Sequence, residues 1–292
     1  PSGGPGDPDA AGDTPGDLQW EPGTVLAVWG PVGAPGRSTV AMGLADEAAQ
    51  DGRRVLLIDA DVYGGVLANA FGLLDESPGL AGACRLAANG RLDGPELSRL
   101  CWTVGDRMAV LTGIARADRW PEVRPSAIPA VLAVARQLAE LVVVDCSAIL
   151  ESDEELSFDT LAPRRNGATL AVLDDADVVL AVGSGDPPGM ERLVRGLAEL
   201  AEAVGSATPQ VVLNRVRRTA ATQAELAAAV RRFAGVGVLA MLPEDRPACD
   251  RAWQRGVTLS AAAPGSPLRA ALRELSARLP SARHGDPVAV PR

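Results

Sequence analysis

The segment from residue 24 to residue 61 constrains the fold of this chain more than any other. It begins with an apolar run (TVLAVWG), passes through a loop rich in glycine and proline (PVGAPGRST), and continues as a helical pattern (VAMGLADEAAQ). A second apolar run (DGRRVLLIDAD) then ends in Asp59-Ala60-Asp61. This order of strand, glycine loop, helix and strand predicts the opening βαβ unit of a phosphate-binding α/β domain.

The glycine loop contains the residue types that a phosphate cradle needs. Glycine lets successive backbone N–H groups approach an anion, and the N-terminus of the helix that follows favours negative charge at the same place. Ser38 would offer its hydroxyl to Mg²⁺, and Arg37 would offer its charge to the β- and γ-phosphates. The residues expected to bind the phosphates are Gly33, Ala34, Gly36, Arg37, Ser38 and Thr39.

The loop departs from the standard pattern G-x-x-x-x-G-K-[ST] at two positions. Pro31 occupies the place of the first Gly, and Arg37 occupies the place of the Lys in a chain that has no Lys at all. Arginine keeps the charge and can grip phosphate with two N–H groups, but it is bulkier than Lys. The alternative is an ordinary turn between a strand and a helix. A loop closed by Pro31 and Pro35, or filled by Arg37, would contradict the phosphate site.

Three carboxylates follow apolar runs and are expected at the same edge of the sheet. Asp59 and Asp61 end the second strand of the opening unit, and Asp145 ends the buried run LVVVD. The carboxyl ends of parallel strands face the crevice in which open α/β sheets bind ligands. We therefore expect Ser38, Asp59 and Asp145 to surround the metal ion. The alternative for Asp59 and Asp61 is the boundary between a strand and a turn, where Asp is common.

Runs of Val, Leu and Ile alternate with helical patterns along the rest of the chain. Continuous apolar strands are typical of parallel sheets that are covered on both faces. We expect one doubly wound α/β domain over residues 23–280, with a mostly parallel sheet of about seven strands and helices on both faces. Residues 1–22, rich in Pro and Gly, are expected to form a flexible linker, and residues 281–292 a disordered tail.

Charge and composition argue against several other classes of function. The net charge of −9 makes nucleic-acid binding by the whole surface an unfavoured hypothesis. The four Cys residues form no C-x-x-C pair and the one His lies near the end of the chain, so zinc sites and His-based catalysis are not expected. No apolar run reaches the ~18 residues of a membrane span and no signal peptide is visible, so the expected location is the cytoplasm.

Together, these features resemble the MinD/ParA family of deviant Walker ATPases. The resemblance rests on the glycine loop, Asp59-Ala60-Asp61, Asp145, Asn214-Arg215 and the segment Leu242–Gly256 (LPED…D-x-A-x-x-x-G). It implies a P-loop NTPase fold of the SIMIBI type that binds ATP and Mg²⁺. It also implies that Arg37 and Asp61 act in catalysis, with Asp61 positioning the attacking water. The residues implied to contact or flank the adenine are Asn214, Pro243 and Glu244.

Two departures from the family pattern bear on activity. Val32 occupies the position of the family's signature Lys, which reaches across a dimer to the partner's ATP, and Cys146 follows Asp145 where a Pro is usual. Loss of a cation that stabilises the transition state lowers phosphoryl-transfer rates by about 10³–10⁵. The resemblance therefore implies ATP binding with weak or absent hydrolysis. One of Arg164 and Arg165 is a hypothetical replacement for the missing cation, and the alternative is a surface pair that balances acidic residues.

Eroded loops of this kind resemble the CpaE/TadZ-like branch of the family and the actinobacterial septum site-determining proteins. That resemblance implies a role in septum-site determination or in placing a pilus or secretion machine. The partners would be proteins of that machine and, in a homodimer, a second copy of the chain. The tail over residues 281–292 is short and broken by Pro, so membrane association would come through partners. The alternatives are a scaffold that does not bind nucleotide, a ParA-type chromosome-partition ATPase and, more distantly, a metabolic kinase.

Overall fold

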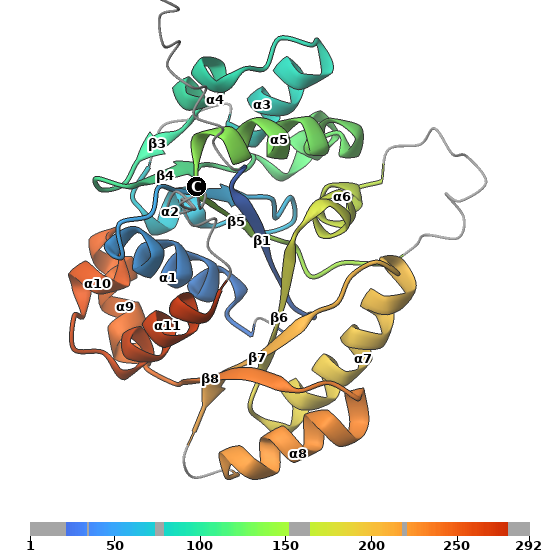
Figure 1. The fold of residues 1–292 in the computed structure, drawn as a ribbon, viewed down its shortest axis with the longest axis vertical. Helices are drawn as coiled ribbons and strands as arrows, with labels where there is room; N and C mark the ends of the chain where they lie inside the picture. Colours follow the sequence, from blue (N-terminus) through green and yellow to red (C-terminus); the bar gives the residue numbers. More distant parts are fainter. Residues whose placement is uncertain (1–21, 34, 74–78, 152–163, 218–220, 280–292) are drawn as a thin grey trace, which may run out of the picture.

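The computed structural model describes residues 22–33, 35–73, 79–151, 164–217 and 221–279 of the chain. Within these ranges, eight strands form one sheet in the order β3-β4-β2-β5-β1-β6-β7-β8 (Figure 1). Neighbouring strands are parallel except β3, which runs antiparallel to β4. The strands are β1 Thr24–Trp29, β2 Val55–Asp59, β3 Trp102–Thr103, β4 Met108–Leu111, β5 Leu141–Asp145, β6 Val178–Ser184, β7 Gln210–Val216 and β8 Val238–Pro243.

Helices cover both faces of this sheet (Figure 1). The α-helices of the described residues are α1 Arg37–Gln50, α2 Leu67–Ala70, α3 Gly79–Ala88, α4 Gly94–Leu100, α5 Ile128–Leu138, α6 Gly167–Asp175, α7 Pro187–Ala203, α8 Gln223–Ala234, α9 Arg246–Arg255, α10 Leu259–Ala262 and α11 Pro267–Arg278. Two 3-10 turns, η1 Ala117–Glu122 and η2 Pro125–Ala127, precede α5. Across the described ranges, no helix combines the length and the apolar character that a membrane span requires.

The predicted doubly wound, mostly parallel α/β fold is confirmed. The strand count differs from the expected seven because β3 is added at the edge of the sheet, and its two residues are too few to show a pattern in the sequence. The predicted linker, apart from its last residue, and the predicted tail over 281–292 lie outside the described residues. The division of the chain into linker, domain and tail therefore stays a prediction.

The sheet separates two apolar cores. One lies between the sheet and the layer of α1 and α11, and it includes Leu44 and Leu272, both fully buried. The other lies under α3, α5, α6, α7 and α8, and it includes Trp29, Leu132 and Leu200. The central strands β1, β2, β5 and β6 are therefore covered on both faces, which is why they read as continuous apolar runs.

Helix α1 is enclosed on nearly all sides. The face predicted for it, formed by Val40, Leu44 and Ala48, is fully buried. Helix α11 approaches it so closely that a Cβ added at Gly43 would lie 2.5 Å from a methyl group of Leu272. Polar contacts reinforce this packing, because Asp46 accepts hydrogen bonds from the backbone and side chain of Ser260 and Glu47 pairs with Arg269 at 2.7 Å. The helix that follows the glycine loop is thus held rigidly.

The order of the strands reverses at β1, which lies between β5 and β6. Strands β5, β2 and β4 lie on one side of β1, and strands β6, β7 and β8 lie on the other side. Open α/β sheets bind ligands at the carboxyl ends of strands where the order reverses in this way. The glycine loop leaves β1 at that point, and Asp59 pairs in register with Asp145 beside it.

Candidate functional site

The loop between β1 and α1 has the backbone shape of an anion cradle. Gly33 and Gly36 both have positive φ, 110° and 93°, a region that residues with a Cβ seldom adopt. Gly36 caps the N-terminus of α1, and a Cβ at this position would collide with Nδ2 of Asn214. Ser38 and Thr39 occupy the first turn of α1, where backbone N–H groups remain free of intrahelical partners. Ala34 lies outside the described residues.

Arg37 turns inward beneath this loop. Its Nε donates to the carbonyl of Cys146 at 3.1 Å, and its Nη1 lies 3.3 Å from the carbonyl of Gly30 and 3.4 Å from that of Pro31. Its Nη2 forms an ion pair with Asp61 at 3.4 Å. The guanidinium therefore ties together the ends of β1, β5 and β2, and contact with a phosphate would require it to give up some of these bonds. This inward placement is the one named above as contrary to a phosphate site, and it favours the scaffold alternative, whereas the exposed side of the loop at Gly33 stays open.

Both prolines of the loop are buried, and the carbonyls of both accept hydrogen bonds from side chains. The carbonyl of Pro31 accepts from Arg37, and the carbonyl of Pro35 accepts from Nδ2 of Asn214 at 2.8 Å. Gly33, in contrast, is exposed to solvent. The outer surface of the cradle is therefore open, while its inner surface is fixed by two polar side chains.

Asp59 and Asp145 form a buried acidic pair at the ends of β2 and β5. Their exposed fractions are 2% and 1%. Burial raises the pKa of Asp59 to about 7, although backbone N–H groups, chiefly that of Leu67, act against the rise. Burial raises the pKa of Asp145 to about 8, the nearby charge of Asp59 adds to it, and the Ser38 hydroxyl and Arg37 oppose it. Raised pKa values mean that both carboxyls resist ionisation, so a bound cation would favour their ionised forms.

The donor set fits Mg²⁺ in the way that nucleotide sites use it. Neither carboxylate oxygen of Asp145 has a hydrogen-bond partner of good geometry, although the Ser38 hydroxyl is close enough to influence its pKa. In the described part of the chain, no three His, Cys, Asp or Glu side chains are grouped to hold an ion by themselves. Mg²⁺ bound to phosphates needs only one or two protein groups and keeps several waters. Ser38, Asp145 and Asp59 are the residues that would hold it.

Asp59 and Asp61 are both held by backbone N–H groups. Asp59 accepts from the N–H of Asp61 at 3.2 Å and from that of Leu67 at 3.1 Å. Asp61 accepts from the N–H groups of Tyr63 and Gly64 at 2.9 and 3.0 Å, besides its ion pair with Arg37. In this arrangement Asp61, the residue expected to position water, is already occupied by three donors.

Arg165 approaches the same segment from the turn that precedes α6. Its Nη2 donates to the carbonyl of Val62 at 3.0 Å, and its guanidinium lies 4.2 Å from the centre of the Tyr63 ring. The acidic residues 153–155, which the alternative interpretation invoked for it, lie outside the described residues. The observed contacts make Arg165 a clamp on the segment that follows Asp61.

The residues expected at the adenine are divided between two places. Asn214, at the end of β7, is 4% exposed and is bonded to the glycine loop. Pro243 ends β8 and lines a hollow of about 470 Å³ together with Val216 and Arg217. Glu244 donates its backbone N–H to the carbonyl of Val216 at 3.2 Å, and its side chain is exposed. The structure brings Pro243 and Glu244 beside this hollow and places Asn214 between the hollow and the loop.

Comparisons with known proteins agree with this geometry. The family described as the CobQ/CobB/MinD/ParA nucleotide binding domain matches residues 26–257. The chain belongs to this family. A comparison with curated protein sequences gave no match.

Several solved structures share the fold of this MinD/ParA-family chain. A ParA family ATPase from Chlorobium tepidum TLS superposes with a TM-score of 0.75 at 18% identity, covering 89% of this chain and 99% of that one. The cell division ATPase MinD of Pyrococcus furiosus superposes with a TM-score of 0.69 at 20% identity, covering 87% and 97%. The septum site-determining protein MinD of Pyrococcus horikoshii OT3, complexed with Mg-ADP, gives 0.67 at 18% identity, covering 87% and 94%. At these identities the likeness establishes the fold alone.

Sequence reasoning missed one charged residue that lies beside the glycine loop. Arg192, on α7, lies against the glycine loop, because a Cβ built on Gly33 would be 2.6 Å from its Nη1. Nothing in the local sequence singles out Arg192, since it is one of three arginines between residues 192 and 215. Its spacing of four residues from Gly196 places both residues on the same face of the helix, and this spacing is the one local sign that Arg192 faces the loop.

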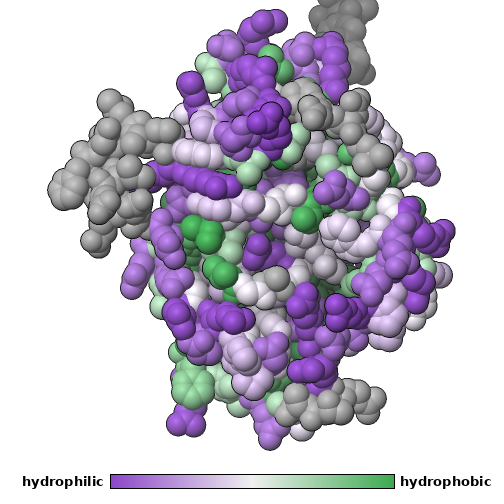
Figure 2. All heavy atoms as spheres, turned by 180° about the vertical axis from the view of Figure 1, so that it is seen from behind, coloured by the Kyte–Doolittle hydropathy of each residue, from purple (hydrophilic) through white to green (hydrophobic). Residues whose placement is uncertain are grey.

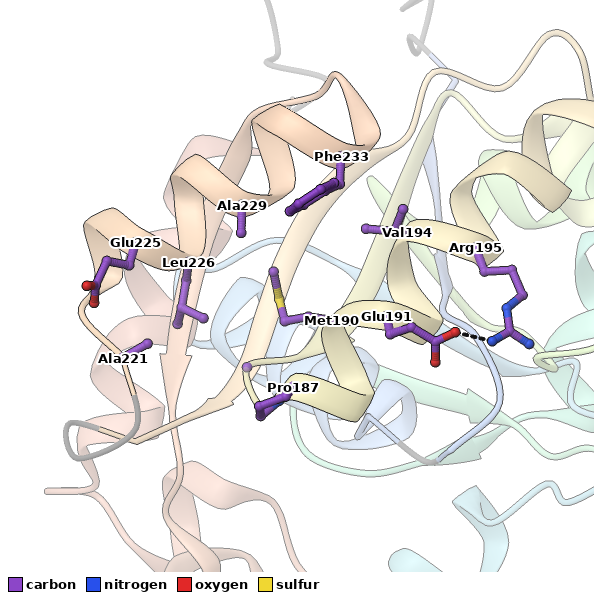
Figure 3. Close-up of a pocket in the computed structure, with 11 residues that line it drawn as sticks. Pro187, Met190, Glu191, Val194, Arg195, Ala221, Glu225, Leu226, Ala229 and Phe233 are labelled. Atoms are coloured by element: carbon purple, nitrogen blue, oxygen red, sulfur yellow. Dashed lines mark hydrogen bonds and ion pairs between the residues drawn. The ribbon is translucent and has the colours of Figure 1, made fainter.

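Sequence reasoning also missed an apolar groove between α7 and α8 with a volume of about 660 Å³ (Figure 3). Met190 and Val194 line it from α7, and Leu226, Ala229 and Phe233 line it from α8. Phe233 is 64% exposed, and an ion pair between Glu191 and Arg195 borders the groove (Figure 3). The face of the molecule in Figure 2 is mostly hydrophilic, with small scattered apolar areas.

Proposed function

We propose that this chain is an ATP-binding positioning protein of the MinD/ParA type, with weak or absent ATPase activity. The observation that carries the proposal is the orphaned carboxylate of Asp145, buried beside Ser38 at the N-terminus of α1. With its pKa raised to about 8, this carboxyl keeps its proton near neutral pH unless a cation stabilises the ionised form. Mg-ATP supplies that cation together with the phosphates that the left-handed glycine loop would cradle.

In this proposal each part of the site has one task. The loop from Gly33 to Thr39 binds the phosphates through its N–H groups, and Ser38, Asp59 and Asp145 hold Mg²⁺ with its waters. The hollow beside Pro243 and Glu244 takes the adenine, with Asn214 between base and phosphates. Bound ATP brings the reactive phosphoanhydride and the metal; the chain binds, orients and partly shields them.

Weak hydrolysis follows from the pairing of Arg37 with Asp61. Arg37 would stabilise charge on the transferred phosphoryl group and Asp61 would orient the attacking water, but in this conformation each neutralises the other. Val32, at the position of the family's second cation, is apolar and 61% exposed. A site that lacks free cations of this kind binds nucleotide better than it cleaves it.

The cellular role in this proposal is septum-site determination or the placement of a pilus or secretion machine, as in the CpaE-like and actinobacterial septum branch. Support comes from the family and from structural neighbours whose names refer to cell division, including a MinC:MinD complex of Aquifex aeolicus. The partner would then be a protein of that machine, with a homodimer as a further assembly. The protein would act in the cytoplasm and reach the membrane through its partners.

Calorimetric titration with Mg-ATP and Mg-ADP tests the proposal. Wild-type protein should bind ATP at or below millimolar concentration, and it should release inorganic phosphate slowly or not at all. Gly36→Ala should abolish binding, because the added Cβ collides with Asn214. Gly52→Ala is the matched control, because Gly52 has nearly the same φ of 91° but no described residue within 4 Å of its Cβ position. Absence of binding to wild-type protein at millimolar Mg-ATP would favour the nucleotide-independent scaffold.

The ParA-type partition ATPase is separated by a second measurement. Such a protein would retain DNA in a manner that weakens steeply with salt, because phosphate contacts release counterions. The net charge of −9 opposes this outcome. Retention of DNA by the ATP-bound protein at 50 mM but not at 200 mM salt would replace the positioning role with partition.

A further inference from the structure

We propose that Arg192 is the second cation of the phosphate site and contacts the terminal phosphate of ATP. It would supply from α7 the charge that Val32 does not supply from the loop. This inference rests on the proposed function, because it requires that the loop bind a nucleotide. It assigns to this chain a selectivity for the triphosphate over the diphosphate.

The first argument is the position of α7 against the loop. Gly196 faces the end of β1 so closely that a Cβ there would lie 2.9 Å from Cβ of Pro31 and 3.2 Å from the ring of Trp29. A residue four positions earlier in a helix lies on the same face, one turn away. Arg192 is that residue, and the close approach at Gly196 fixes its backbone beside the loop.

The second argument is the contact that the Arg192 side chain makes. A Cβ built on Gly33 would be 2.6 Å from Nη1, 3.1 Å from Cδ and 3.2 Å from Cζ of Arg192. The end of the side chain therefore occupies the space that a Cβ of residue 33 would need, and any side chain at position 33 would displace it. Gly33 is exposed, so the guanidinium meets the open side of the cradle.

The third argument is the distribution of charge around the loop. Arg37 lies beneath the loop and is paired with Asp61, whereas Val32 adds no charge at the tip. The described acidic neighbour of Arg192 is Asp186, whose pKa is lowered first by the Ser184 hydroxyl and further by Arg217 and Arg192. Asp186 already accepts hydrogen bonds from the Ser184 hydroxyl and from the N–H of Gly189. The charge of Arg217 also acts on its carboxylate. Arg192 is exposed, so it can turn from Gly33 to an anion without leaving a buried charge behind.

The fourth argument concerns which phosphate the guanidinium would meet. The N-terminus of α1, at the far end of the loop from Gly33, favours the phosphates nearest to it. The hollow proposed for adenine lies beside Pro243, on the side of Asn214. The phosphate that extends furthest from the base then lies over the start of the loop. Arginine is well suited to that position because its planar fork binds phosphate oxygens in pairs.

The test compares the dissociation constants of Mg-ATP and Mg-ADP for four proteins. Arg192→Ala should weaken Mg-ATP binding by about tenfold or more, the effect of losing one charge-assisted hydrogen bond. Its affinity for Mg-ADP should change by less than about twofold, since the diphosphate does not reach Arg192. Arg192→Lys should recover part of the ATP affinity. Arg195→Ala, which removes an exposed arginine on the same helix that is paired with Glu191, should change neither constant.

A double variant separates charge from packing. Val32→Lys in the Arg192→Ala background should restore Mg-ATP affinity, because it returns a cation to the same side of the loop. Equal loss of ATP and ADP affinity in Arg192→Ala, or no loss of either, would overturn the assignment while the proposed function stands. Wild-type protein that binds neither nucleotide would overturn both. Urea unfolding of each variant shows whether the fold is intact.

Discussion

Asp145 provides the most direct test of the acidic pair, because among the described residues its buried carboxylate has no hydrogen-bond partner of good geometry. Its pKa is raised to about 8 by burial, whereas the pKa of an unfolded Asp is about 3.9. Between these two values, the folded protein holds a proton that the unfolded chain has released. The free energy of unfolding is therefore highest below the pKa of Asp in the unfolded chain. It falls as the pH rises towards the pKa of Asp145 in the folded protein, by about 1.4 kcal/mol per pH unit for one such group.

Asp145→Asn removes this titration while keeping the size of the side chain. Between pH 5 and pH 7, Asp145 should lower the free energy of unfolding of the wild-type protein by about 3 kcal/mol, and the variant should lack this loss. Asp59, with its pKa raised to about 7, keeps its own contribution in the variant, so the pH dependence becomes smaller without vanishing. A change of this size is a large share of the total stability of a domain, which is about 5–15 kcal/mol.

The assay is urea unfolding at pH 5, 6 and 7 in the presence of EDTA, so that no divalent cation occupies the site. Asp250→Asn, which removes an exposed carboxylate on α9, is the control and should follow the wild-type curve. If Asp145→Asn loses as much free energy as the wild-type protein between pH 5 and pH 7, Asp145 does not carry the proton and the argument from its burial is wrong.

Two further predictions concern packing. Gly65→Ala should destabilise the protein by about 1–3 kcal/mol, because its Cβ would lie 2.7 Å from Oδ1 of Asp59. Gly64→Ala, with open space around its Cβ, should have little effect. The midpoints of urea unfolding compare the two variants. Leu272→Ala should lower the free energy of unfolding by about 2–5 kcal/mol, since Leu272 is fully buried. Phe233→Ala should lower it by less than about 1 kcal/mol, since Phe233 is 64% exposed. Equal effects within either pair would contradict the packing described here.

Much of the fold could be predicted because its signal is local. The strands are apolar runs, and the buried face of α1 follows from the spacing of Val40, Leu44 and Ala48. The edge strand β3 could not be predicted, because two residues show no period and tertiary pairing with β4 decides their conformation.

The candidate site was predictable in its parts but not in its connections. The sequence places Asp59 and Asp145 at strand ends, and strand order alone brings them together in register. The direction in which Arg37 points depends on carbonyl groups of Gly30, Pro31 and Cys146, which no spacing rule reveals. Arg192 was missed for the same reason, because its approach to Gly33 arises from helix packing across a separation of 159 residues (192 − 33).

Trp29 gives the molecule an optical reporter of its own. Among the tryptophans of the described ranges it is the one that is fully buried, and it occupies the last position of β1, directly before the loop and against Gly196 of α7. An indole in apolar surroundings fluoresces at shorter wavelength than one in water, so the blue edge of the emission spectrum belongs mainly to Trp29. Any rearrangement that separates α7 from the loop would shift that edge, and it could be followed in unlabelled protein in real time.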